Sequence, residues 1–293
     1  MDYVESRLNE QGMAEGQTDD WIFVDWVDFP MHKRGVLCFE QILFLKALET
    51  MRFFASLLSE SCPVCSNAVA ALRSGIRQTF WSNDRHAFLH ALEDGRLNEQ
   101  VTRFPNMFAI LYDFASDEEK QQILENVLSN PAVPAITTPY MRFYELEALC
   151  MMRQQEQVLK EMKDYWGGML REGATTFWEK YNPGEHGTGH LAMYGRPYGK
   201  SLCHAWGASP LYLLGRYFLG VRPTSSGYKD YEVRPVPAGL EWMEGDVPTP
   251  FGRIHVSVTP HEVIVVSDGG TGKLTVGEQE VEIPALKEVR LKR

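Results

Sequence analysis

The sequence lacks a hydrophobic run long enough to span a membrane. Its apolar stretches, such as Ala68–Leu72 and Val263–Val266, are only a few residues long, whereas a transmembrane helix needs about 20 apolar residues. The N-terminus is acidic, and no basic region followed by an apolar stretch marks a signal peptide. The sequence therefore predicts no membrane partner and, by default, a cytoplasmic location.

An excess of positive charge is also missing. The 293 residues contain 29 Lys and Arg against 39 Asp and Glu, which gives a formal net charge of -10. A chain of this charge is repelled by phosphate backbones, so we expect no nucleic-acid partner.

Cysteine is scarce, and the five cysteines are scattered and odd in number, so no disulfide framework is indicated. Cys62 and Cys65 have CxxC spacing, but no second ligand pair accompanies them, and a structural zinc site needs four ligands. We interpret them as thiols at a helix end or in the core.

Several catalytic motifs are missing as well. The sequence contains no P-loop, no dinucleotide-binding glycine pattern, no His-Glu-x-x-His and no Gly-x-Ser-x-Gly. No dedicated calcium cage is present either, so we expect neither a cofactor nor a metal. Aromatic residues, in contrast, are plentiful, with 7 Trp, 12 Tyr and 15 Phe, which suits the stacking of flat rings or simply a large core.

Helical patterns dominate the first three quarters of the chain. Val36–Leu58 carries apolar residues at helical spacing. Ser116 and Glu119 have the spacing of a capping box, and Thr138-Pro139 supplies an N-cap and a proline at the first helical position. A further helix over residues 154–167 is expected to end at a glycine pair.

After Pro223 the pattern becomes alternating and rich in turns, which predicts short strands. The strand candidates are Tyr231–Pro235, Ile254–Val258, Val263–Val266, Lys273–Val276, Val281–Ile283 and Val289–Leu291. Several short strands in about 70 residues indicate a small antiparallel sandwich. We therefore predict a mainly α chain with a helical domain over residues 1–221 and a β-domain over residues 222–293. Trp242, Met243 and Phe251 are expected to pack the β-domain on the helices.

Residues 19–28 combine four carboxylates with two tryptophans and include Asp25 and Trp26. Carboxylates accept hydrogen bonds from hydroxyl groups, and the face of a tryptophan covers the apolar face of a sugar ring. This composition fits a carbohydrate platform. It also fits a loop whose acids cap helices and whose tryptophans fill the core.

Glu179 lies between the aromatic residues Trp178 and Tyr181. Partial desolvation there would raise the pKa of its carboxyl group, which suits acid–base chemistry. The alternative is an exposed glutamate paired with Lys180 or Lys200.

Two further segments carry histidines. His186 and His190 have the spacing of metal ligands, but the flanking glycines favour a mobile loop over the helix that would align them. We therefore expect a loop here rather than a metal site. His204 enters the last long helix, which we place within Ser201–Gly220, where it could bond a ligand hydroxyl or serve a structural role.

Taken together, these segments resemble the α-L-rhamnosidases of glycoside hydrolase family 78. The most specific match is in three pieces: residues 173–179 (G-A-T-T-F-W-E), 201–215 and 217–223. Upstream, residues 21–26 resemble the family's D-W loop, and Phe104–Leu111 resembles a family helix with an asparagine in its first turn. The resemblance implies an (α/α)6 toroid of six helical hairpins followed by a β-sandwich.

The resemblance also implies inverting hydrolysis of terminal rhamnosyl or related glycosides. In such a reaction one acid protonates the leaving oxygen, and a second carboxylate, roughly 6.5–9.5 Å away, activates water on the opposite face. Glu179 matches this water-activating base. The residues that match or fit sugar contacts are Asp25, Trp26, Trp81, His204, Tyr194 and Arg196. We expect Asp25, Trp26, Glu179 and His204 to converge on one concave face, because each lies at a loop–helix junction.

The chain departs from the family pattern in one respect. No segment matches the acid-rich motif that holds the family's general acid, and the predicted helices are too few for six complete hairpins. We therefore expect the C-terminal part of a catalytic domain with its β-domain, as a fragment, a split gene product or a degenerate member. Uncovered apolar helix faces would favour a homodimer or a separately encoded N-terminal half as partner. The alternative functions are a non-catalytic carbohydrate-binding protein and another α/α-toroid glycosidase.

Overall fold

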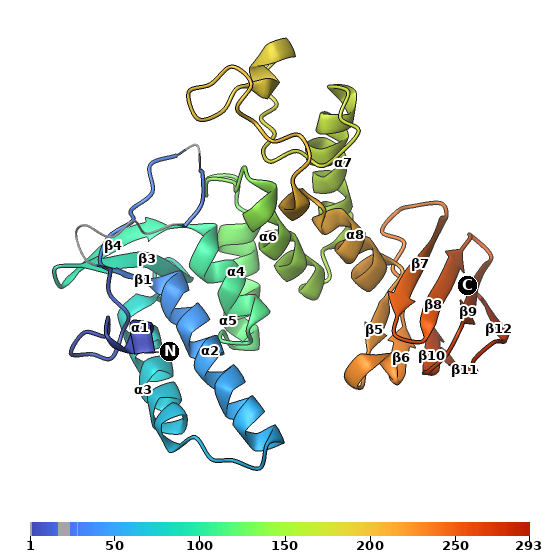
Figure 1. Ribbon diagram of the computed structural model, residues 1–293, viewed down its shortest axis with the longest axis horizontal. Coiled ribbons are helices and arrows are strands. Elements are labelled where there is room, and N and C mark those ends of the chain that lie inside the picture. The colour runs from blue at the N-terminus through green and yellow to red at the C-terminus, as the bar shows by residue number, and fades with distance from the viewer. Residues whose placement is uncertain (1, 17–23, 28) are drawn as a thin grey trace. The chain divides into compact units, whose positions relative to one another are not determined.

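Figure 1 shows the computed structural model, which describes residues 2–16, 24–27 and 29–293. The chain divides into two compact units, residues 1–152 and 153–293. The elements of the first unit are α1 (Asp2–Glu5), β1 (Val36–Leu37), α2 (Cys38–Leu57), α3 (Pro63–Phe80), β2 (Trp81–Ser82), β3 (Ala87–Glu93), β4 (Arg96–Val101), α4 (Arg103–Leu111), α5 (Asp117–Ile123), the π-helical η1 (Leu124–Leu128) and α6 (Pro139–Met151).

The second unit begins with α7 and ends with the β-sandwich. Its elements are α7 (Gln155–Arg171), the 3-10 helices η2 (Gly187–Leu191) and η3 (Ala205–Gly207), α8 (Ser209–Leu213), the π-helical η4 (Leu214–Phe218), β5 (Val221–Pro223), the 3-10 helix η5 (Ser226–Tyr228), β6 (Asp230–Val233), β7 (Met243–Thr249), β8 (Gly252–Val258), β9 (Glu262–Ser267), β10 (Thr271–Val276), β11 (Gln279–Ile283) and β12 (Glu288–Lys292). Helices followed by largely antiparallel sheets confirm the predicted fold class. The domain boundary at residues 221 and 222 stays a prediction.

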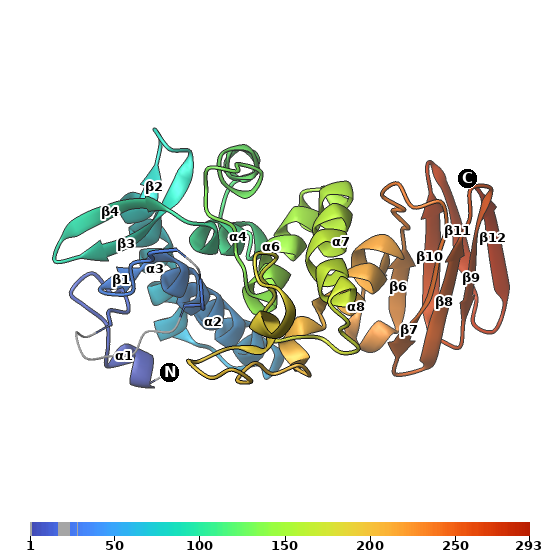
Figure 2. The same ribbon diagram turned by 90° about the horizontal axis from the view of Figure 1, so that it is seen from above.

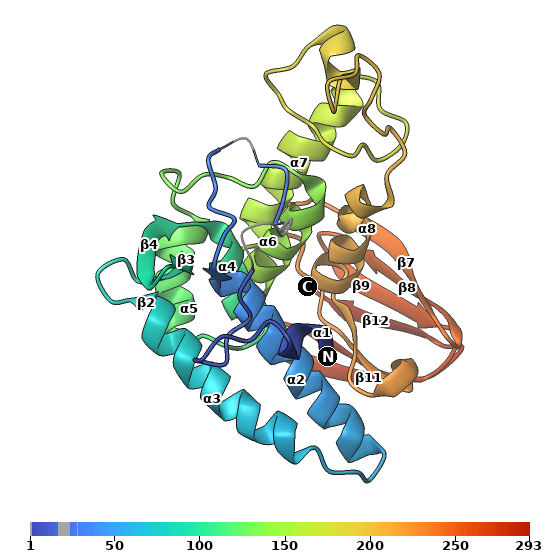
Figure 3. The ribbon, with the colours of Figure 1, turned by 60° about the vertical axis from the view of Figure 1, so that its left-hand side comes forward.

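The long helix predicted at Val36–Leu58 is present as α2, which lies beside α3 (Figure 3). The capping box that precedes α5 is also confirmed. Ser116 Oγ accepts from the Glu119 amide at 3.3 Å, and the Glu119 side chain accepts from the Ser116 amide at 2.8 Å. Cys62, the N-cap of α3, is disulfide-bonded, which the interpretation as a free thiol did not predict.

A small sheet interrupts the helical part, and the sequence did not predict it. Strands β1, β2 and β4 each pair with β3 in antiparallel register. Asn106, fully buried in α4, fastens this sheet to the helices: its amide accepts from the Phe88 backbone N–H at 2.9 Å and donates to the Phe88 carbonyl at 3.0 Å. This pair satisfies both backbone groups of a residue in β3.

A buried ion pair organises the neighbouring helices of the first unit. The Arg103 guanidinium at the start of α4 donates to the Glu145 carboxylate on α6. The same guanidinium donates to the carbonyl oxygens of Leu128 at 3.1 Å and Val133 at 3.2 Å. Breaking such a pair by removing one partner typically costs about 3–5 kcal/mol, because the other charge is left buried.

The glycine pair expected to end the helix after residue 167 does not end it. Helix α7 continues through Gly167 and Gly168 to Arg171. The reason is packing, because a Cβ on Gly168 would lie 2.4 Å from a ring carbon of Tyr181. Gly168 therefore makes room for an aromatic ring inside the helix, and the local stop signal is overridden.

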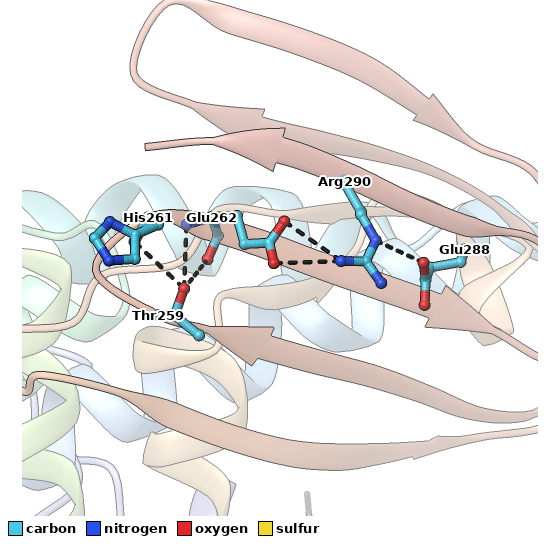
Figure 4. A network of polar contacts seen from close by, with 5 residues as sticks. All are labelled: Thr259, His261, Glu262, Glu288 and Arg290. Atoms are coloured by element: carbon cyan, nitrogen blue, oxygen red, sulfur yellow. Dashed lines mark hydrogen bonds and ion pairs between the residues drawn. The ribbon is translucent and has the colours of Figure 1, made fainter.

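The C-terminal strands form two sheets, with strand orders β11-β10-β6-β5 and β12-β9-β8-β7 (Figure 2). All pairs are antiparallel except β6 with β10, which is parallel. Alternate residues of β8 and β9 are buried, as a sandwich core requires. Figure 4 shows a surface link between β9 and β12, in which Arg290 Nη1 lies 3.3 Å from Glu262 Oε1.

The β-domain packs on η4 through small and aliphatic residues. Gly215 lies against Val247, and Gly245 lies against Leu219. Met243 is buried as expected, but Trp242 and Phe251 stay 67% and 49% exposed. Those two aromatic residues therefore contribute less to this contact than the sequence predicted. Among the described residues, no helix is both long and apolar enough to cross a membrane.

His90, on β3, is a titratable side chain in the core of the first unit. It is fully buried, with Nε2 2.8 Å from the His32 carbonyl and Nδ1 2.9 Å from the Thr102 hydroxyl. Because a carbonyl only accepts, Nε2 carries the proton and Nδ1 accepts from Thr102. Burial lowers the pKa of His90 to about 4.

We predict that this group makes the free energy of unfolding fall as the pH drops from about 6.5 to about 4, by about 3 kcal/mol. The sign follows because the unfolded chain binds the proton at the higher pH. The variant His90→Gln keeps one donor and one acceptor but does not titrate, so urea unfolding should show a flatter pH profile. The same change at the exposed His261 should leave the profile as in the wild type. Equal profiles for His90→Gln and wild type would contradict the assignment.

Candidate functional site

Glu179 lies in the irregular segment between α7 and η2. Its backbone N–H donates to the Ser201 carbonyl at 2.9 Å, and the His204 N–H donates to the Phe177 carbonyl at 2.8 Å. Two segments far apart in the loop therefore run alongside each other. This pairing fixes the position of Glu179 without a helix or a regular strand.

Glu179 is 5% exposed, and its carboxylate is bonded at both oxygens. Oε1 accepts from the Tyr194 hydroxyl at 2.5 Å, and Oε2 accepts from the Ser201 backbone N–H at 3.0 Å. Glu179 is thus buried rather than exposed, and Lys200 pairs instead with Glu185 at 3.0 Å. A carboxylate offers about four lone-pair sites, so the geometry leaves capacity for a further donor such as water.

Tyr194 reaches Glu179 from a tight turn. Met193 and Arg196 exchange two backbone hydrogen bonds of 3.0 Å, and the central residues Tyr194 and Gly195 have φ of 56° and 70°. This is the pattern of a type I′ turn. Glycine adopts it freely, whereas a tyrosine at positive φ costs on the order of 1–3 kcal/mol. The two backbone hydrogen bonds of the turn hold Tyr194 in this conformation, from which its hydroxyl reaches Glu179.

The phenol of Tyr194 is a permanent donor at neutral pH. Desolvation and the hydrogen bond to the Glu179 carboxylate raise the pKa of Tyr194 to about 12. The side chain is nevertheless 56% exposed, so its ring also forms part of the surface over Glu179. Arg196 closes the same turn and is exposed.

His204 forms an aromatic pair beside Glu179. Its ring centre lies 4.1 Å from that of Trp206, and the Trp206 indole N–H donates to the Glu179 carbonyl at 3.2 Å. His204 directly precedes the short η3 rather than entering a long helix. Trp206 was not among the predicted site residues, although an aromatic residue two positions after His204 was the available signal.

In the first unit, Asp25 is 1% exposed and engaged by neighbouring groups. The Thr138 hydroxyl lies 2.7 and 2.6 Å from its two carboxylate oxygens, and the Trp26 N–H donates to Oδ1 at 2.8 Å. Thr138 was predicted as the N-cap of α6. It occupies that position, but its hydroxyl serves Asp25 instead of the helix. A sugar hydroxyl would therefore have to share Asp25 with Thr138.

The two predicted tryptophans are both partly exposed. Trp81, in β2, donates from its indole to Asn83 Oδ1 at 2.9 Å and packs edge-on against Phe88. Trp26 follows Asp25 directly. The remainder of the predicted platform, residues 19–23 and Asp28, lies outside the described residues.

Asp25, Trp26 and Trp81 belong to the first compact unit, and Glu179, Tyr194, Arg196 and His204 belong to the second. Within the second unit, hydrogen bonds and ring contacts bring Glu179, Tyr194 and His204 together through Trp206. Convergence of the two groups on one face stays a prediction.

The loop that contains His186 and His190 is folded more tightly than the sequence predicted. His190 lies in η2, and one donor atom each of Glu172, His186 and His190 lie within 4.8 Å of one another. The glycines next to the histidines therefore permit a compact turn that brings the two imidazole ring centres to 6.5 Å from each other.

Two family models match the chain. Residues 1–218 match the bacterial alpha-L-rhamnosidase 6 hairpin glycosidase domain, and residues 220–264 match the bacterial alpha-L-rhamnosidase C-terminal domain. Together these matches cover most of the sequence, in the order helical part and then strands.

Two curated relatives are alpha-L-rhamnosidases. The protein from Alteromonas sp. (strain LOR) is 34% identical over 129 residues, which is 41% of this chain and 12% of the relative. The protein from Formosa agariphila is 26% identical over 163 residues, which is 53% of this chain and 17% of the relative. Each match spans less than a fifth of the relative's length.

Solved structures show the same fold. The GH78 family rhamnosidase of Bacillus sp. GL1 is similar with a TM-score of 0.78 and 24% identity, over 94% of this chain and 30% of that one. The Streptomyces avermitilis alpha-L-rhamnosidase complexed with L-rhamnose gives a TM-score of 0.72 and 13% identity, over 99% of this chain and 29% of that one. With a family model matched over residues 1–218, the chain belongs to the bacterial α-L-rhamnosidase family of six-hairpin glycosidases.

Proposed function

We propose that the chain is the C-terminal part of the catalytic domain of an inverting α-L-rhamnosidase-like glycoside hydrolase, in which Glu179 activates the attacking water. The observation that carries this proposal is the Glu179 carboxylate, which is buried, held by two donors and still able to accept a third. Few waters reach the carboxylate of a residue that is only 5% exposed. That setting suits a base that must orient a single water.

The reaction then proceeds as inversion requires. Water bonded to Glu179 attacks the anomeric carbon, its proton passes to the carboxylate, and the glycosidic oxygen leaves from the opposite face with a proton from a general acid. In the family this acid lies in an acid-rich motif that the present sequence does not contain. The chain therefore supplies the base side of the site, and we expect slow turnover or none from the chain alone.

The sugar contacts proposed in the second unit surround this base. The Tyr194 hydroxyl donates to Glu179, and His204 packs on Trp206, whose indole N–H donates to the Glu179 carbonyl. Arg196 ends the Tyr194 turn. In the first unit, Trp26 and Trp81 are partly exposed and can cover an apolar sugar face. We propose that Asp25 acts chiefly by holding Trp26, since its carboxylate is already bonded to Thr138.

A non-catalytic carbohydrate-binding protein is the alternative function. The missing acid-rich motif favours it, because sugar contacts without a proton donor give binding and no cleavage. The two functions differ in whether any form of the protein turns over a rhamnoside in a manner that depends on Glu179.

A partner that covers part of the first unit is a further proposal. Four apolar residues near the end of α2 are more than half exposed: Phe53, Phe54, Leu57 and Leu58. Exposed apolar groups on one helix end are typical of a surface that another chain covers. A second copy or a separately encoded N-terminal half would both fit.

The first test replaces Glu179. We predict that Glu179→Gln lowers the turnover of an aryl rhamnoside by about 10²–10⁴-fold, because general-base help is lost, while rhamnose affinity changes little. Turnover is measured for the chain alone and together with an N-terminal half, and affinity by calorimetry. The isosteric change Glu278→Gln, on an exposed turn, serves as the matched control.

The outcomes separate the functions. Activity that is lost in Glu179→Gln but kept in Glu278→Gln supports the assigned base. Turnover that survives Glu179→Gln contradicts it. Rhamnose binding without turnover in any form supports the binding protein, and an absence of both contradicts the family activity for this chain.

The second test addresses Tyr194 as a positioning residue. Tyr194→Phe keeps the ring and the turn but removes the donor to Glu179. A hydrogen bond to a charged group contributes about 1.5–3 kcal/mol, so we predict a fall in kcat of about 10–100-fold with KM changed by less than about 3-fold. Tyr198→Phe, on the same loop and 76% exposed, should leave both constants unchanged. A rise in KM at unchanged kcat would assign Tyr194 to sugar binding alone.

The third test addresses the convergence of the two units. If Trp26 and His204 contact one sugar, Trp26→Ala and His204→Ala should each weaken rhamnose binding by about 3–10-fold, in line with the energy of a ring contact. Calorimetric titration measures both. Weakening in only one of the variants would show that the residues do not share a sugar site.

A further inference from the structure

We propose that Glu172, His186 and His190 form a binding site for a divalent transition metal of the zinc class. One donor atom of each residue lies within 4.8 Å of the others. Donors bound to one ion lie at most about 4 Å apart, since Zn–N bonds are about 2.0–2.1 Å. Glu172 and His186 are exposed, so modest rotation of these two side chains closes the difference.

His190 supplies the independent observation. It is 2% exposed, and neither of its ring nitrogens has a hydrogen-bond partner. Its ring stacks on Tyr181 at 5.6 Å with an interplanar angle of 11°, which fixes the direction of both nitrogens. Leaving a buried polar atom without a partner costs about 1–3 kcal/mol, and a bound ion would remove this cost.

The carboxylates around His190 have the arrangement of a metal-bound histidine. Nε2 lies 3.5 Å from Glu172 Oε2, on the side of the proposed ion, and Nδ1 lies 3.7 Å from Glu185 Oε2. Metal-binding histidines commonly donate their other N–H to a carboxylate, which sets the tautomer. Glu185 is in turn held by the buried Lys200.

The chemistry of the donors selects the ion. Two imidazoles and one carboxylate suit Zn²⁺, Co²⁺ or Ni²⁺, whereas Ca²⁺ and Mg²⁺ prefer oxygen ligands alone. Three protein ligands leave a fourth position for water. The ion would tie η2 to the end of α7, because Glu172 directly follows α7 and His190 lies in η2.

This site lies in the loop that also carries Tyr194, yet it rests on none of the proposed glycosidase chemistry. Its test is therefore a metal-binding measurement. The chain, free of any polyhistidine tag and treated with a chelator, is titrated with Zn²⁺ by calorimetry. Co²⁺ is added in a second experiment, in which a tetrahedral d–d spectrum reports the imidazole and carboxylate ligands.

We expect one Zn²⁺ per chain. His186→Ala and Glu172→Gln each remove an exposed ligand, so the fold is preserved, and each should weaken binding by at least about 10-fold. His261→Ala and Glu278→Gln change exposed residues of the same types outside the cluster and should bind as the wild type does. An excess of Ca²⁺ should not displace the ion.

Three results would overturn the proposal. One is the absence of stoichiometric Zn²⁺ binding. Another is unchanged affinity in His186→Ala. The third is an equal loss of affinity in His261→Ala, which would place the ion elsewhere.

Discussion

The burial of the Glu179 carboxylate constrains the whole loop region of the second unit. An ionised carboxylate is costly to bury unless several donors reach it. Those donors come from two separate places, the Tyr194 hydroxyl and the Ser201 backbone N–H. The chain must therefore return twice to the segment around Glu179. The loop's path, including the unusual backbone of Tyr194, follows from this requirement.

Helix α7 provides the rigid support for that loop. The Tyr181 ring fills the notch at Gly168, and the Tyr181 N–H donates to the Tyr165 hydroxyl at 3.1 Å. Trp166 on the same helix donates to the Gly207 carbonyl at 2.8 Å. Both segments that pair around Glu179 are thus anchored to one helix. Support of this kind is what holds a functional side chain within a narrow range of positions.

The predictability of the fold differs between local and tertiary features. The capping box at Ser116 and Glu119 depends on four consecutive residues, so its spacing alone was sufficient. Strands β8 and β9 were predicted from their alternation because one face of each is buried. Strands β5 and β7 were not predicted. Strand β3 is buried along its first five residues. Because these residues are buried on both faces, the segment lacks the alternation that marks a strand, and the small sheet was missed.

The site was predictable only where a side chain carries the signal. The family resemblance identified Glu179 and His204, but the Ser201 N–H that holds Glu179 is a backbone donor, which every residue type except proline supplies. Thr138 is a second case in which the sequence does not predict the hydrogen-bond partner. Its position before Pro139 predicts that its hydroxyl caps the helix. Only the fold reveals that this hydroxyl bonds to Asp25 instead of to a helix N–H.

Glu179 and His190 are both buried in this loop region, and they differ in how completely their polar atoms are bonded. Both carboxylate oxygens of Glu179 have donors, so its position is fixed before any ligand arrives. Both nitrogens of His190 face carboxylates at distances longer than a hydrogen bond. A bonded group is preorganised for its reaction, whereas an unbonded buried group gains stability from whatever completes it. The loop therefore contains one group already held in place and a second that a bound ion would complete.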